Sequence, residues 1–378
     1  MWAARRRQLL QLQGLAALAG LQGLSISQVI ASPRVSTNRT AISTRVLAAW
    51  NDQTGYRAGI LAITADSCQI QDSVSLPTRA HGLTLLPNGE IMVVARRPGD
   101  WVLRWQPSQS ATTAAHSHQL YWAEPNRQFN GHLILHPNGQ QLLSTETDSV
   151  TDQGLIGIRD RQSLRLLGQW PSGGRDPHQL MLNPAGTHLW VANGGISSRP
   201  ETGRSRLAST RLDSSVCEIS LATGQIERQW VLKDPWLSQR HFSYHAASQT
   251  LGVALQAEHP IAKDRLAAPV LAMIQTSEGL TGSIKTGRVV DDMLGYGGDI
   301  CADQSGFWVS SPKGSRLTHY GLDGRPTRAL NLHKVCALSR QGTTVLAAGR
   351  QLAGRIQEKG LQELASPLQA DNHWLVLS

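Results

Sequence analysis

Short apolar runs separated by polar turns recur along most of the chain. Six segments share one plan, in which an apolar run leads to a Gly or Asn turn, a second apolar run and a polar corner. They span residues 81–95, 132–145, 178–192, 241–255, 299–310 and 334–348. Pro-Asn-Gly and Ala-Gly turns tolerate positive φ, and the flanking runs are rich in β-branched and aliphatic residues. The pattern therefore predicts six β-hairpins.

Further short apolar runs follow the hairpins and raise each unit to about four strands, at spacings of roughly 35–60 residues, as in propeller blades. A seventh unit takes strands from both ends of the chain: His373–Leu377 innermost, then Arg45–Trp50, Ala58–Ile63 and Gln69–Leu76. We therefore predict an all-β fold, a seven-bladed β-propeller closed by pairing N- and C-terminal strands in one blade. Six or eight blades are the alternatives.

The predicted register brings polar residues to one mouth of the central channel. The start of a blade's first strand and the end of its second must share one face of the disc, because the two strands are antiparallel. Five first strands start at a histidine, in a chain with 13 histidines. These candidate metal ligands are His81, His132, His178, His241 and His373. The candidate ligand-binding residues around them are Arg96, Arg97, Glu146, Asn193, Gln256, Asp299, Lys334 and Arg350.

Two chemistries suit such a ring. Clustered imidazoles beside a carboxylate hold a borderline transition metal such as copper, iron or zinc. Together with Arg96 and Arg97 they would instead clamp an anionic ligand. Each histidine taken singly is as well explained by a structural bond to a loop or a neighbouring strand. No residue pattern assigns a catalytic group.

The first residues are typical of an export signal. Arg5, Arg6 and Arg7 precede a weakly apolar stretch over residues 9–24, and Val29–Ala31 fits a small-residue cleavage site. We predict a twin-arginine export signal over residues 1–31, a linker over 32–44 and the propeller over 45–378, with an ordinary secretory signal as the alternative. This organisation predicts a periplasmic protein without a stable membrane span after cleavage.

Composition narrows the class of partner. The chain has 17% charged and 40% hydrophobic residues, enough to bury a core, and its formal charge of +9 is not gathered into a Lys/Arg block. We therefore expect no nucleic-acid binding, and we expect a monomer. Of the four cysteines, Cys301 and Cys336 occupy matching positions in neighbouring blades, so we predict that no disulfide joins them.

Several motifs together resemble a known family. They are Arg79–Gly82, Ala95–Gly99, Phe129–His132, Thr145–Asp148, Gly154–Asp160, Pro177–His178, Val191–Ile196 and Leu237–His241. Over residues 45–378 they are similar to those of the exported domain-of-unknown-function family fifteen-thirteen, which is related to YVTN-type and quinoprotein-type propellers. The chain departs from the family where Asn130 replaces the usual Tyr, and in an Arg-rich loop over residues 196–214 that we interpret as a lid.

The resemblance implies a periplasmic seven-bladed propeller from gene clusters linked to iron, with imelysin-like or other periplasmic iron-uptake proteins as partners. It implies no reaction. Two hypotheses follow: a binding propeller that works in iron acquisition, or a metal-dependent or redox enzyme. The second rests on analogy with nitrous oxide reductase, which gathers histidines at the hub of a seven-bladed propeller.

Overall fold

The computed structural model describes residues 44–108, 117–197, 211–277 and 284–377, and β-strand is the dominant secondary structure of these residues. The predicted export signal and nearly all of the predicted linker lie outside the described residues, as does most of the 196–214 loop. The helical elements in the described part are η1 (Ala246–Ser248), α2 (Ala262–Leu266) and η2 (Asp291–Met293). None of them is long and apolar enough to cross a membrane.

Five antiparallel sheets have four strands each. They comprise β4 (Ala80–Leu85), β5 (Ile91–Ala95), β6 (Trp101–Gln106) and β7 (Ser117–Trp122); β8 (Arg127–Leu135), β9 (Gln141–Asp148), β10 (Gly154–Asp160) and β11 (Leu166–Pro171); β12 (Pro177–Leu182), β13 (His188–Asn193), β14 (Ser215–Ser220) and β15 (Ile226–Trp230); β16 (Leu237–His245), β17 (Thr250–Ala257), β18 (Leu271–Gln275) and β19 (Ile284–Thr286); and β20 (Ile300–Ala302), β21 (Gly306–Ser311), β22 (Arg316–Gly321) and β23 (Pro326–Asn331).

The remaining sheet has seven strands and joins the two ends of the chain. Its order is β24 (Ala337–Gln341), β25 (Thr344–Ala348), β26 (Arg350–Gln357), β27 (Gly360–Leu377), β1 (Thr44–Asp52), β2 (Gly55–Ile63) and β3 (Cys68–Ser75). The long β27 pairs with β26 through its first half and with β1 through its second half. The predicted pairing of N- and C-terminal strands is therefore present.

The turns of the hairpins form as the sequence predicts. Gly89, Gly139 and Gly186 have φ of +83°, +72° and +65°. In each turn the glycine N–H donates to the carbonyl three residues earlier, for example from Gly89 to Leu86 (2.9 Å). Positive φ at this position is the reason for glycine, because other residues are strained there.

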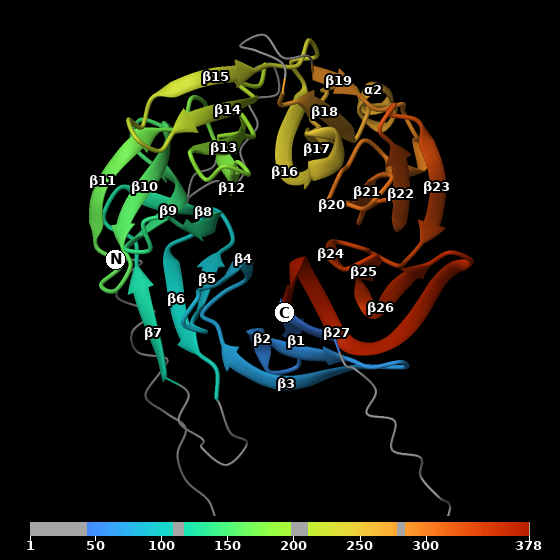
Figure 1. Ribbon diagram of the computed structural model, residues 1–378, viewed down its shortest axis with the longest axis horizontal. Helices are drawn as coiled ribbons and strands as arrows, with labels where there is room; N and C mark the ends of the chain where they lie inside the picture. The colour runs from blue at the N-terminus through green and yellow to red at the C-terminus, as the bar shows by residue number, and fades with distance from the viewer. Residues whose placement is uncertain (1–43, 109–116, 198–210, 278–283, 378) are drawn as a thin grey trace, which may run out of the picture. The chain divides into compact units, whose positions relative to one another are not determined.

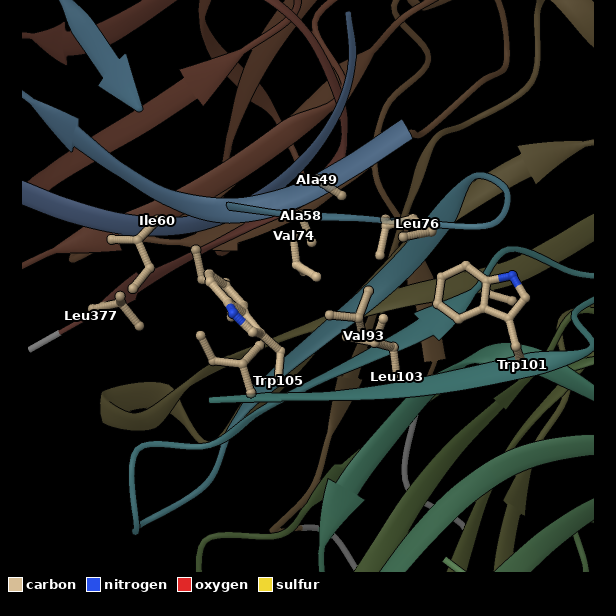
Figure 2. Close-up of a cluster of buried hydrophobic side chains, with 14 residues drawn as sticks. Ala49, Ala58, Ile60, Val74, Leu76, Val93, Trp101, Leu103, Trp105 and Leu377 are labelled. Atoms are coloured by element: carbon tan, nitrogen blue, oxygen red, sulfur yellow. The ribbon is translucent and has the colours of Figure 1, made fainter. Parts of the chain in front are cut away.

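The sheets follow one another around a common axis (Figure 1), as in a β-propeller. Their inner strands contact one another in the order β4, β8, β12, β16, β20, β24 and β27, and β27 contacts β4 again. Apolar side chains fill the space between successive sheets. In Figure 2, Val74 from one sheet faces Val93 and Trp105 of the next.

All four cysteines are buried thiols, and burial raises the pKa of Cys301 and of Cys336 to about 12.

Buried ion pairs add to this packing. Glu146 is fully buried and accepts hydrogen bonds from Arg127 (2.6 Å) and Arg159 (2.7 Å), and Arg159 also donates to Glu124 (2.9 Å). Burial alone would raise the pKa of Glu124, but hydrogen bonds from Arg159 and Tyr121 outweigh it and lower the pKa to about 2. The folded state thus favours the ionised form of Glu124 more than the unfolded state does.

This difference predicts a loss of stability in acid. Because the folded-state pKa of Glu124 is depressed, its contribution is present above about pH 4.5 and disappears as the pH falls towards 2. The variant Glu124→Gln should therefore show a smaller drop in Tm between pH 7 and pH 3 than the wild type. The control variant Glu358→Gln changes an exposed carboxyl outside the network and should keep the wild-type drop. Equal drops in all three proteins would contradict the assignment.

Candidate functional site

The five predicted histidines converge at the hub of the ring. His81 lies on β4, His132 on β8, His178 on β12, His241 on β16 and His373 on β27, all of them inner strands. We call these five residues the histidine cluster. Their ring centroids are 4.4–5.8 Å apart in the nine pairs that are in contact. The placement that the blade register predicted for the histidines is therefore present.

Local irregularities of the strands aim these side chains inward. Every histidine of the cluster lies within or next to a register shift between its inner strand and the neighbouring strand. Such bulges turn the strand and re-aim a side chain. The inner strands β20 and β24 pair with their neighbours without a recorded shift, and neither contributes a histidine.

The nitrogen atoms of the cluster are very close together. The Nε2 atoms of His81, His178 and His241 form a triangle with sides of 3.2, 2.9 and 3.4 Å. His373 Nε2 lies 3.1 Å from His241 Nε2. His132 completes the group, since one ligand atom from each of His81, His132, His241 and His373 lies within 4.8 Å of the others.

Four of the five rings of the cluster favour the neutral form. The pKa values of His81, His132, His178 and His241 lie well below the usual range, because burial disfavours the charged form. Neighbouring imidazoles and arginines act in the same direction. A neutral imidazole keeps a lone pair on one ring nitrogen, which is the form that binds a metal ion.

A carboxylate fixes the orientation of one ring. Asp299 precedes β20, and its Oδ1 lies 3.1 Å from His373 Nδ1. An ionised carboxylate only accepts, so with Asp299 as the acceptor the proton of His373 is on Nδ1 and its lone pair is on Nε2, on the side of the cluster. The N–H of Leu338 donates to the other oxygen of Asp299 (2.9 Å) and holds the carboxylate in place.

Three further predicted residues lie beside the cluster. Arg96, Arg97 and Gln256 line a small cavity together with His81, His178 and His241. Arg97 is ion-paired with Asp176, which also pairs with Arg240 (2.9 Å). Arg96 lies 3.9 Å from Asp371, which pairs with Arg79.

The other four predicted residues do not join the site. Glu146 points into the buried ion-pair network, and Asn193 Nδ2 donates to the Ser172 carbonyl (2.9 Å). Thr145 precedes Glu146 and faces the opposite side of the strand, as adjacent strand residues do. It is the Thr145 hydroxyl that bonds the backbone carbonyls of His132 and His178. Lys334 is exposed, since a turn from Leu332 to Val335 delays the start of β24.

Arg350 is exposed for a related reason. The second strand of its blade ends at Ala348, so Arg350 already opens the third strand, β26, outside the hub. Its N–H donates to the His333 carbonyl. Among the predicted ligand-binding residues, the hub therefore includes only Arg96, Arg97, Gln256 and Asp299.

Sequence reasoning missed several polar residues of the hub, although a pattern marks them. Two residues before each cluster histidine stands a polar residue: Arg79, Asn130, Asp176, Gln239 and Asp371. Four of these five residues are buried. Tyr296 and Asn372, which also line the cavity, had no such signal.

Comparisons with known proteins agree with this architecture. The family described as "Protein of unknown function (DUF1513)" matches residues 74–377. The chain belongs to this family. The match includes every residue of the histidine cluster, so the cluster lies within the family's domain. No curated protein matches the sequence.

Solved structures similar to this DUF1513 protein show the fold alone, because their sequence identities are low. Hydrazine synthase from Kuenenia stuttgartiensis is 13% identical with a TM-score of 0.55, over 81% of this chain and 92% of that one. A streptogramin B lyase is 12% identical with a TM-score of 0.52, over 85% and 88%. A functionally unknown protein from Desulfotomaculum acetoxidans is 8% identical with a TM-score of 0.57, over 88% and 98%.

A glycine next to the cluster is predicted to be indispensable. Gly131 has φ of +112°, and a Cβ there would lie 2.5 Å from Cδ2 of His81. Gly139 also has positive φ (+72°), but a Cβ there would meet nothing within 4 Å. Gly139→Ala should cost about 1–2 kcal/mol of unfolding free energy. Gly131→Ala should cost clearly more, because the His81 ring must also move. Equal losses in urea unfolding would show that the hub is not tightly packed.

Proposed function

We propose that this protein is a periplasmic seven-bladed propeller that binds one transition-metal ion at the histidine cluster. If the first half of β27 is assigned to one four-stranded unit and its second half to the next, the chain has seven such units. Seven hydrophobic clusters, one at each junction between successive units, support this blade count. One of these clusters lies between the two halves of the seven-stranded sheet. That sheet is thus best interpreted as two blades joined through β27.

The observation that carries the metal proposal is the triangle of Nε2 atoms. A hydrogen bond between two imidazoles needs a proton on one nitrogen and a lone pair on the other. Three nitrogens in mutual contact cannot alternate in this way, so at least one pair is always lone pair against lone pair or proton against proton. Protonating one of the rings adds another donor, and at least one pair of nitrogens still has two lone pairs or two protons facing each other. A cation that accepts all three lone pairs removes it.

The spacing also suits a metal ion. Ligand nitrogens at 2.0–2.1 Å from an ion are about 2.9 Å apart in octahedral geometry and about 3.3–3.4 Å apart in tetrahedral geometry. The sides of the triangle, 2.9–3.4 Å, fall in this range. His373, with its Nδ1 bonded to Asp299, and His132, whose Nε2 has no hydrogen-bond partner among the described residues, would supply further ligands.

The donor set points to a class of metal. Imidazole nitrogen suits zinc, copper, iron and nickel, whereas magnesium and calcium require oxygen ligands. The carboxylate that contacts the cluster, that of Asp299, bonds Nδ1 of His373 and so acts as a support. We therefore propose a borderline divalent transition metal.

The setting of this function is proposed on the family resemblance and on the sequence of the N-terminus. We propose that the protein is exported to the periplasm and takes part in iron acquisition with imelysin-like partners. Catalysis at the bound ion is the second candidate, and the cavity beside the cluster favours it because a reacting molecule needs an open side.

The proposal predicts stoichiometric metal binding. Protein isolated from the periplasmic fraction, stripped with a chelator and reloaded, should hold one zinc, copper, iron(II) or cobalt ion per chain by elemental analysis, and calcium should not compete. Metal at 100 times its Kd should add about 2.7 kcal/mol to the unfolding free energy. Intact mass on the same sample reports whether residues 1–31 have been removed.

A matched pair of variants separates the hub from adventitious histidines. The double variant His178→Ala with His241→Ala removes two corners of the triangle and should bind no metal while keeping a β-sheet circular dichroism spectrum. The control His333→Ala removes an exposed histidine and should bind as the wild type does. Undiminished metal in the double variant would refute the site.

A further inference from the structure

His373 differs from the other histidines of the cluster in its backbone. It lies in β27 at the register shift between the pairs Trp50–Ala370 and Ala48–Trp374. Its φ is +68°, and no other residue of the cluster has a positive φ. A residue with a side chain is strained in this left-handed region, and such strain persists only where surrounding contacts hold it. The place of His373 in the cluster therefore depends on contacts from outside β27.

Asp299 provides such a contact, and it connects three inner strands. The residue is buried and directly precedes β20. Its Oδ1 accepts from the N–H of Ile300 (2.9 Å) and lies 3.1 Å from Nδ1 of His373 in β27. Its Oδ2 accepts from the N–H of Leu338 in β24 (2.9 Å). Both oxygens act as acceptors, so the carboxylate is fixed in its orientation towards the His373 ring.

Other rings of the cluster do not have this support. Nδ1 of His81 and Nδ1 of His178 have no hydrogen-bond partner among the described residues. A metal-binding imidazole is usually fixed by a bond from its second nitrogen, which selects the tautomer and orients the ring. The ring of His373 is bound in this way although its backbone is strained.

We propose that Asp299 is a positioning residue of the metal site, which keeps the proton of His373 on Nδ1 and so makes Nε2 of His373 a ligand of the ion. This inference rests on the proposed metal site. Asp299 does not touch the ion. It acts through the His373 ring, and it holds that ring in the cluster from the neighbouring strand β20.

Asparagine at position 299 would have nearly the same shape but could not do this. One end of an amide accepts and the other end donates. If the amide oxygen faces Leu338, the NH₂ group meets the N–H of Ile300, and His373 must accept at Nδ1 with its proton on Nε2. If the amide is reversed, its NH₂ group meets the N–H of Leu338. The first orientation removes a ligand of the ion, and the second sets two donors against each other.

The same sheet supplies a matched control. Asp303 follows β20, and its Oδ1 lies 3.2 Å from Nε2 of His319 in β22. This is also a partly buried pair of aspartate and histidine, and His319 is not in the cluster. Asp299→Asn and Asp303→Asn therefore make the same chemical change to two such pairs. Both variants should lower the unfolding free energy, and only the first should change metal affinity.

The experiment combines two measurements. Nitrogen NMR of histidine-labelled, chelator-stripped protein reads the tautomer of each ring, and the His373 signal is assigned by its loss in His373→Ala. Wild type should carry the His373 proton on Nδ1. Cobalt(II) affinity is then measured by competition with a chelator. Asp299→Asn should bind cobalt about 10–100-fold more weakly than wild type, and Asp303→Asn should match wild type.

Each contrary result has a separate meaning. A His373 proton on Nε2 in the stripped wild type refutes the proposal without any variant, so the test stands even if Asp299→Asn fails to fold. Equal cobalt affinity in Asp299→Asn and wild type refutes the role of Asp299 and leaves the metal site intact. An equally large loss in Asp303→Asn assigns the effect to weaker folding and also refutes the proposal. If wild type binds no cobalt, the proposed function and this inference both fail.

Discussion

Three imidazole nitrogens in mutual contact impose a constraint that hydrogen bonding alone cannot meet. Any assignment of protons to His81, His178 and His241 leaves one repulsive pair in a buried site. Burial also holds these rings neutral, so charge repulsion is avoided while the conflict between lone pairs remains. The surrounding structure must hold the rings together against this repulsion, and a bound cation would turn it into attraction.

The propeller supplies the rigidity that such an arrangement needs. Successive sheets bury their apolar faces against each other all the way round, and β27 joins the last strands to β1. Five of the inner strands each deliver one histidine to the axis, at a bulge that turns the side chain inward. Gly131 allows the His81 ring to approach closely, and the Thr145 hydroxyl ties two histidine strands together. The geometry of the hub therefore depends on closure of the whole ring.

The sequence was sufficient to predict the hairpins, the closing strand pair and the meeting of the five histidines. Their positions follow from turn chemistry and from the antiparallel register, both of which are local properties. The sequence did not predict the direction of a side chain where a shift of one strand position reverses it. Glu146 stands one strand position from Thr145, whose hydroxyl bonds the backbone of two cluster histidines. Asn193 bonds the Ser172 carbonyl instead, and a turn that the pattern did not reveal displaces Lys334. The ion pairs of Asp176 and Asp371 join residues far apart in the chain. The only sequence signal for these ion pairs is the polar residue two positions before each histidine.

The most direct measurement of the central claim is X-ray absorption at the edge of whichever metal the purified protein carries. The account predicts a first shell with at least three imidazole nitrogens at about 2.0–2.1 Å, with the multiple-scattering signature of histidine rings. A shell of oxygen or sulfur donors without imidazole, or protein that takes up no transition metal after reconstitution, would contradict it.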